Sequence, residues 1–278
     1  MPYKDILVHV DSSKNCQSRI ELAVRLARSQ NAHLIGLFIA TAPDVPEFVQ
    51  SLMGQQVQDL QARFQKEAQE QARKMWDEFA GKSGLSLEWR AVEGDPVEQL
   101  SMHGRYADLV VVGQRDNSIG GDGGSIDIAD ELVFELGRPV MVVPYVGNFK
   151  KLGERVMVAW NASRESTRAV GDTIPLLRDA KQVVVLAINP HGGQNGHGAV
   201  PGADISQHLA RHNVKAEAQH VFAEDIDVGN MLLSRAADED IDLIVMGCYG
   251  RSRLREMVLG GATRHIMRHM TVPVIMSH

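Results

Sequence analysis

Short apolar runs alternate along nearly the whole chain with longer segments in which apolar residues recur at helical spacing. Strands that alternate with helices favour right-handed crossovers and a parallel sheet covered by helices on both faces. For the second half of the chain we predict strands at about 155–160, 182–188, 216–222, 242–247 and 273–276, and helices at about 163–179, 203–213, 227–239 and 261–270.

Local signals mark several helix boundaries. Ser163 is a predicted N-cap, because its hydroxyl can accept a hydrogen bond from a free amide of the first turn. Asp95 followed by Pro96 predicts an N-cap and a first helical position, in a helix that ends near Tyr106. Pro175 is expected to kink or shorten the helix that contains it.

The pattern repeats within the chain. The segment DLVVVG at 108–113 returns as DLIVMG at 242–247, a shift of 134 residues, and ILVHVD at 6–11 matches VMVAWN at 156–161, a shift of 150. We therefore predict two similar domains, residues 1–146 and residues 154–278, joined by a linker.

Two further expectations follow from the repeat. The shifts differ by 16 residues, and this surplus falls in the polar segment 47–82, where Val57, Leu60 and Phe64 recur at helical spacing. The last strands, 141–143 and 274–276, are matching apolar edges, so we expect them to pair and the two domains to pack as an internal pseudo-dimer.

Composition excludes several classes of protein. The 278 residues are 44% apolar and 23% charged, as in globular proteins, and the longest apolar runs are too short to span a bilayer. A net charge of −6 gives no general attraction to nucleic acid or to an anionic membrane. The first residues have no signal-peptide pattern, and Cys16 and Cys248 are expected to be free thiols, so we predict a cytoplasmic protein.

A glycine-rich loop carries the candidate chemistry. GCYG at 247–250 is followed by nine residues and then by GGAT at 260–263, at the start of a predicted helix. Glycines let backbone amides approach an anion closely, and a helix N-terminus adds free donors and a favourable dipole. Parallel sheets bind ligands beyond the carboxyl ends of their strands, where the strand order reverses.

These features resemble the universal stress proteins: a first strand that ends in Asp, the ADLVVVG or IDLIVMG strand, the G-x2-G-x9-G loop and a final RPV or VPV strand. The resemblance covers both halves. It implies two doubly wound α/β domains, each with a five-stranded parallel sheet of order 3-2-1-4-5. It also implies ATP binding, as in many members, and pairing through the last strand.

The resemblance also implies the residues of an adenine-nucleotide site. Two of these residues depart from the family: Asn161 replaces an acid, and Gly261 replaces a hydroxyl residue, so weaker binding is expected. The base would lie near Ala159, Asn161, Ile188 and Met246, and the ribose and phosphates near Gly247, Gly250, Gly260, Gly261, Ala262 and Thr263.

The first copy keeps the family's acid as Asp11 but lacks the loop, because no glycine follows three residues after Gly113. The segment 114–135 holds six acids and one arginine, whereas 251–268 holds five arginines and one acid. A polyphosphate is repelled by the first segment and attracted by the second. We therefore predict that nucleotide binds in the second domain only.

No catalytic triad, paired carboxylates or Walker-type loop is present, so dedicated catalysis is not expected. Three functions stay open: an ATP-responsive stress protein, a slow ATPase on the same fold, and a nucleotide-free scaffold that acts through protein partners. A homodimer of the tandem chain and an unidentified protein partner also stay open. His191 and His197, like His265 and His269, are spaced as metal ligands can be, but we expect them to be loop and surface residues.

Overall fold

The computed structural model describes six segments of the chain: residues 2–41, 47–115, 128–190, 200–223, 225–248 and 261–278. The first half contains β1 (Asp5–Val10), α1 (Cys16–Gln30), β2 (His33–Ala40), α2 (Glu47–Phe79), β3 (Leu87–Glu93), α3 (Pro96–Gly104), β4 (Leu109–Gly113), α4 (Ile128–Glu135) and β5 (Val140–Val143). The second half contains β6 (Arg155–Ala159), α5 (Arg164–Asp179), β7 (Gln182–Ile188), α6 (Ala203–Arg211), β8 (Ala216–Val221), α7 (Val228–Asp238), β9 (Leu243–Gly247), α8 (Gly261–His269) and β10 (Val274–Ser277).

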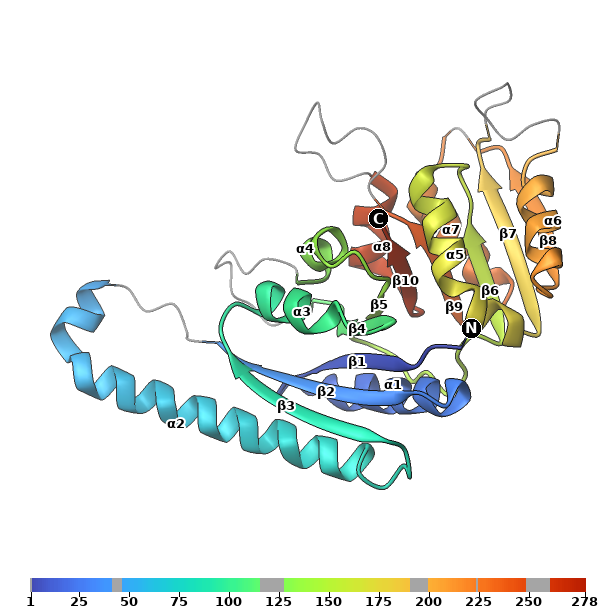
Figure 1. Ribbon diagram of the computed structural model, residues 1–278. Helices are drawn as coiled ribbons and strands as arrows, with labels where there is room; N and C mark the ends of the chain where they lie inside the picture. Colours follow the sequence, from blue (N-terminus) through green and yellow to red (C-terminus); the bar gives the residue numbers. More distant parts are fainter. Residues whose placement is uncertain (1, 42–46, 116–127, 191–199, 224, 249–260) are drawn as a thin grey trace.

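The strands of the described segments form one sheet in the order β3-β2-β1-β4-β5-β10-β9-β6-β7-β8. Each half has the order 3-2-1-4-5, with all of its neighbouring strands parallel. The two halves meet at β5 and β10, which pair antiparallel with Met141 opposite Ile275 (Figure 1). The apolar last strands therefore cover each other's edges.

Helices cover both faces of this sheet. Residues of α1, α2, α5 and α6 pack in one apolar cluster, and residues of α3, α4, α7 and α8 pack in another on the opposite face. The doubly wound α/β class predicted from the alternating pattern is confirmed. No helix in the described segments has the length and apolar character needed to cross a membrane.

The predicted caps have the expected geometry. The Ser163 hydroxyl accepts from the backbone N–H of Ser166 at 3.1 Å, and the Asp95 carboxylate accepts from Glu98 N–H at 2.9 Å, with Pro96 as the first residue of α3. Each cap satisfies an amide that its helix leaves without an internal partner. These caps fix where α5 and α3 begin.

Of the two effects expected at Pro175, a kink or a shortened helix, the shortening does not occur. Helix α5 continues through Pro175 to Asp179. Leu176 and Leu177 are buried against the sheet, and this burial offsets the one hydrogen bond that proline removes.

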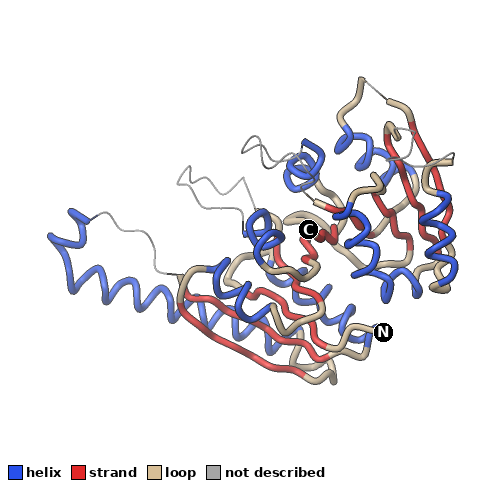
Figure 2. The backbone as a smooth tube through the Cα atoms, turned by 45° about the horizontal axis from the view of Figure 1, so that its top comes forward, coloured by secondary structure: helices blue, strands red, loops and turns tan. Residues whose placement is uncertain are grey.

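Helix α2 accounts for the surplus chain of the first half, and its N-terminal end projects away from the sheet in both views (Figures 1 and 2). Its C-terminal part packs on the core through Ala72 and Trp76, which are almost fully buried. Leu60 and Phe64 lie further out, with 53% and 58% of their surface exposed. The predicted helix is therefore present, but the part of it that carries Leu60 and Phe64 lies outside the core.

We expect Leu60→Ser and Phe64→Ser each to change the free energy of unfolding by less than about 0.5 kcal/mol, because each side chain keeps more than half of its surface in water after folding. Urea denaturation of the two variants measures this. A loss above about 1.5 kcal/mol in either variant would show that this part of α2 packs on something in solution.

Candidate functional site

A cavity opens at the carboxyl ends of β6 and β9, which are parallel neighbours with Ala159 opposite Met246. The chain leaves β6 towards β7 on one side, while β9 and β10 lie on the other. The strand order thus reverses at this point, and open parallel sheets bind their ligands in such crevices.

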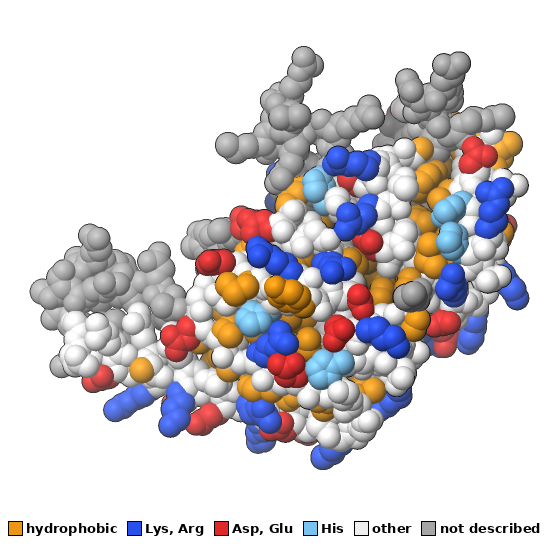
Figure 3. Space-filling view, in the orientation of Figure 1, with side chains coloured by type: hydrophobic (Ala, Val, Ile, Leu, Met, Phe, Trp, Pro, Cys, Tyr) orange, Lys and Arg blue, Asp and Glu red, His pale blue; other side chains and the backbone are white. Residues whose placement is uncertain are grey.

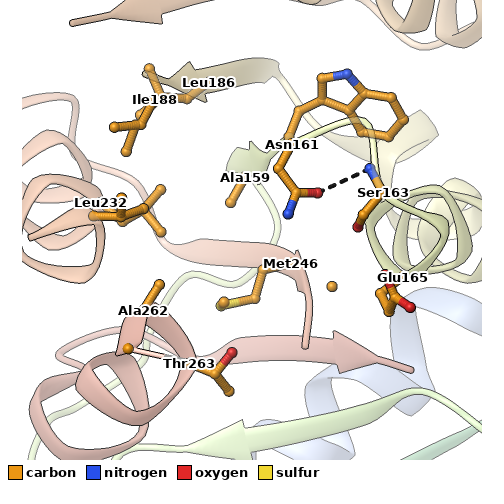
Figure 4. A pocket seen from close by; sticks show the side chains of 14 residues that line it. Ala159, Asn161, Ser163, Glu165, Leu186, Ile188, Leu232, Met246, Ala262 and Thr263 are labelled. Carbon is orange, nitrogen blue, oxygen red and sulfur yellow. Dashed lines mark hydrogen bonds between the residues drawn. The ribbon is translucent and has the colours of Figure 1, made fainter. Parts of the chain in front are cut away.

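The cavity has a volume of about 220 Å³, slightly below the ~300 Å³ at which typical small-molecule sites begin. One wall is apolar, and the side chains of Ala159, Ile188, Leu232, Met246 and Ala262 converge on it from different elements (Figure 4). The opposite side carries polar groups. The lining residues are Ala159, Trp160, Asn161, Ser163, Glu165, Leu186, Ile188, Val228, Leu232, Met246, Gly247, Gly261, Ala262 and Thr263.

Eight of the ten residues that the sequence suggested for an adenine-nucleotide site border this one cavity. The other two, Gly250 and Gly260, lie outside the described residues. The lining residues that sequence reasoning missed include Leu186, Val228 and Leu232. Strand periodicity could have found Leu186, because it shares a face of β7 with Ile188. The two α7 residues had no comparable signal, since their helix could have packed elsewhere.

The Asn161 amide points into the cavity (Figure 4). Its carbonyl oxygen accepts a hydrogen bond from the backbone N–H of Ser163 at 3.1 Å. This bond fixes the orientation of the amide and leaves its NH₂ group as a donor towards the cavity. Asn161 can therefore donate to a ligand hydroxyl oxygen, whereas the family's carboxylate can only accept.

Glu165 is a buried acid in the first turn of α5 that also borders the cavity. Burial raises the pKa of its carboxyl group. Hydrogen bonds from its own backbone N–H and from the Ser163 hydroxyl, together with the charge of Arg164, lower the pKa, and their combined effect is larger. The net pKa lies below the usual value, so Glu165 is ionised at neutral pH. A fixed negative charge stands on this side of the cavity.

Glycine is required at position 247 by a close approach of two backbones. A Cβ at Gly247 would collide with the backbone nitrogen of Ser166. The first turn of α5 can therefore lie directly against the end of β9.

The start of α8 supplies the other end of the site. Gly261, Ala262 and Thr263 form its first turn, which contains no acidic residue, and Thr263 is buried. The amides of a first helical turn lack partners within the helix and favour anions. This turn faces the cavity directly after segment 249–260, which lies outside the described residues.

The histidines considered as metal ligands do not gather into a metal site in the described part of the chain. His265 and His269 have ring centroids 4.5 Å apart, and His265 lies 3.7 Å from an Asp227 oxygen. No group of three or more His, Cys, Asp or Glu side chains among the described residues is arranged to hold a metal ion. His191 and His197 lie outside those residues.

Together, the fold and the cavity define a tandem α/β protein with a ligand crevice at the strand reversal of its second half. The chain belongs to the universal stress protein family, whose model matches residues 2–144 and again residues 153–278. A universal stress protein of Methanocaldococcus jannaschii is 32% identical over 69 residues, a match that spans 23% of this chain and 43% of that relative.

Solved structures share the fold over nearly the whole chain. A universal stress protein from Archaeoglobus fulgidus DSM 4304 has a TM-score of 0.69 at 14% identity, covering 98% of this chain and 95% of that one. A functionally unknown protein from Pseudomonas aeruginosa PAO1 has a TM-score of 0.57 at 13% identity, covering 99% and 92%. At these identities the likeness shows the fold alone.

Proposed function

We propose that the second half binds ATP or a related adenine nucleotide, and that the chain is a nucleotide-responsive stress protein without dedicated catalysis. The observation that carries this proposal is the single cavity that brings the ends of β6 and β9 together with the start of α8. These elements are distant in the sequence. Their shared cavity supports the site that the family resemblance implies for base, ribose and phosphates.

The cavity offers each part of a nucleotide a suitable surface. Ala159, Ile188 and Met246 provide apolar surface for the faces of a purine ring. Asn161 can bond a ribose hydroxyl through its free NH₂ group. The amides at the start of α8 are donors for phosphate oxygens.

Charge also supports a phosphate-bearing ligand. Five arginines and one acid lie between residues 251 and 268, around the start of α8. Over the face of the molecule shown in Figure 3, Lys and Arg are interspersed with Asp and Glu. A surface that binds nucleic acid typically carries a continuous basic patch instead.

Titration calorimetry of the purified chain with ATP tests the proposal. We expect saturation at one ATP per chain, with a dissociation constant of about 1 μM or weaker (about 8 kcal/mol), because Asn161 and Gly261 replace the family's acid and hydroxyl residue. Absence of binding at millimolar ATP, or saturation at two, would contradict it. A single-turnover assay on the same sample separates binding from slow hydrolysis.

A further inference from the structure

The first half contains a close counterpart of the cavity's apolar wall. Leu7 pairs with Ile35 and Val110, as Met157 pairs with Val184 and Ile244, so the two halves are in the same register. Two residues of the second-half wall recur unchanged at the matching positions of β2. Leu37 stands where Leu186 stands, and Ile39 stands where Ile188 stands.

His9 takes the place of Ala159, which borders the cavity of the second half. Each follows a buried residue of the same face, Leu7 or Met157, by two positions. The imidazole therefore stands where Ala159 presents a methyl group, and His9 is only 8% exposed. Burial lowers the pKa of His9, the charge of Asp11 raises it, and the charge of Arg19 lowers it. The net pKa is about 4, so the ring is neutral at pH 7.

Both carboxylate oxygens of Asp11, the counterpart of Asn161, already have partners. Oδ2 accepts from the Arg19 guanidinium at 2.7 Å, and Oδ1 accepts from the backbone N–H and the hydroxyl of Ser13. Arg19 holds its position through a second bond, from Nε to the His9 carbonyl at 2.7 Å. Asp11 is thus occupied within the protein, whereas the NH₂ group of Asn161 is available.

Arg19 also fills the space beside Gly113, the counterpart of Gly247. A Cβ at Gly113 would collide with Nη1 of Arg19. In the second half the matching position of α5 is Ala169, and the first turn of α5 itself lies against the glycine. The buried guanidinium and the buried imidazole therefore occupy the crevice end of β1 and β4 from opposite faces of the sheet.

We propose that His9 and Arg19 are the residues that exclude adenine from the first half, and that giving this half the residues of the second creates an additional adenosine site. This inference rests on the proposed function, that the cavity of the second half binds an adenine nucleotide. It explains binding in the second half only by the side chains that fill the crevice of the first half. The acidic segment after β4 then acts only on phosphates.

The test is a triple variant, His9→Ala with Asp11→Asn and Arg19→Ala, which reproduces Ala159, Asn161 and Ala169. Asp11 is changed because a carboxylate without its arginine would stay partly buried and unpaired. Adenosine is the probe, because it carries no charge for the acids of α4 to repel. Calorimetry is expected to count one more adenosine per chain in the variant than in the wild type.

The wild-type count tests the proposed function, and the difference between variant and wild type tests this inference. A triple variant with a cooperative thermal transition but no additional adenosine would overturn the inference, whatever the wild-type count. The reciprocal change Ala159→His supplies a second arm in an otherwise intact chain. It is expected to remove the adenosine site of the second half, and undiminished binding would equally overturn the inference.

Discussion

Ala262→Trp is expected to weaken ATP and adenosine binding by about 100-fold or more, equivalent to about 2.8 kcal/mol. Ala262 lies in the first turn of α8, and its methyl group borders the cavity of about 220 Å³. An indole at this position would fill space where the ribose and phosphates are expected. Calorimetric titration with both ligands measures the loss, and loss with uncharged adenosine shows that the space for the nucleoside is affected as well as that for the phosphates.

The matched control is Ile128→Trp, at the corresponding start of α4 in the first half. It adds the same side chain where we expect no nucleotide, so affinity should change less than about twofold, or 0.4 kcal/mol. Equal losses in the two variants would show that the effect is a general disturbance of the fold. Unchanged affinity in Ala262→Trp would show that this cavity is not the nucleotide site.

Arg19→Ala is expected to lower the free energy of unfolding at pH 7 by about 2 kcal/mol, less than the ~3–5 kcal/mol for breaking a fully buried ion pair. The Arg19 side chain is 4% exposed and that of Asp11 34%, so water partly compensates the carboxylate that loses its partner. Asp11→Asn combined with Arg19→Ala is expected to recover part of this loss, because no unpaired charge then remains.

The loss should depend on pH in a defined direction. Burial raises the pKa of Asp11, but the charge of Arg19, with His9 and the hydrogen bonds from Ser13, holds it well below the usual value. The ion pair therefore stabilises the wild type above the unfolded pKa of about 3.9 and loses its effect as pH falls below that value. Without Arg19, burial favours protonated Asp11, so acid stabilises the variant relative to the wild type.

Urea denaturation of the wild type and Arg19→Ala at pH 7 and at about pH 4 tests this sign. The difference in unfolding free energy should be smaller at the lower pH. A difference that stays constant, or a variant as stable as the wild type at pH 7, would show that the ion pair does not stabilise the fold.

Much of the fold could be predicted because it follows from patterns within short segments. The strand-length apolar runs and the caps at Ser163 and Asp95 placed elements close to their observed bounds. The internal repeat predicted the pairing of the two last strands, since both are short, apolar and buried. Whether Pro175 shortens its helix could not be predicted, because local propensity does not include the burial of the leucines that follow it.

The candidate site could be predicted only where a strand or a glycine loop marks it. Asn161 and Gly247 were expected at the crevice because they stand at strand ends, and Met246 came from the family resemblance, but Leu232 depends on how α7 packs across the sheet. The first half shows the same limit more clearly. Asp11 fits the family pattern, and only the tertiary contact with Arg19, eight residues later, shows that its carboxylate is already occupied.

A crystal structure of the chain grown with ATP tests the central claim most directly. The account predicts one nucleotide per chain, with its base between Ile188 and Met246, its ribose at Asn161 and its phosphates at the first turn of α8, while the Arg19–Asp11 pair stays closed in the first half. A nucleotide bound in the first half, or an empty cavity in the second half at saturating ATP, would contradict it.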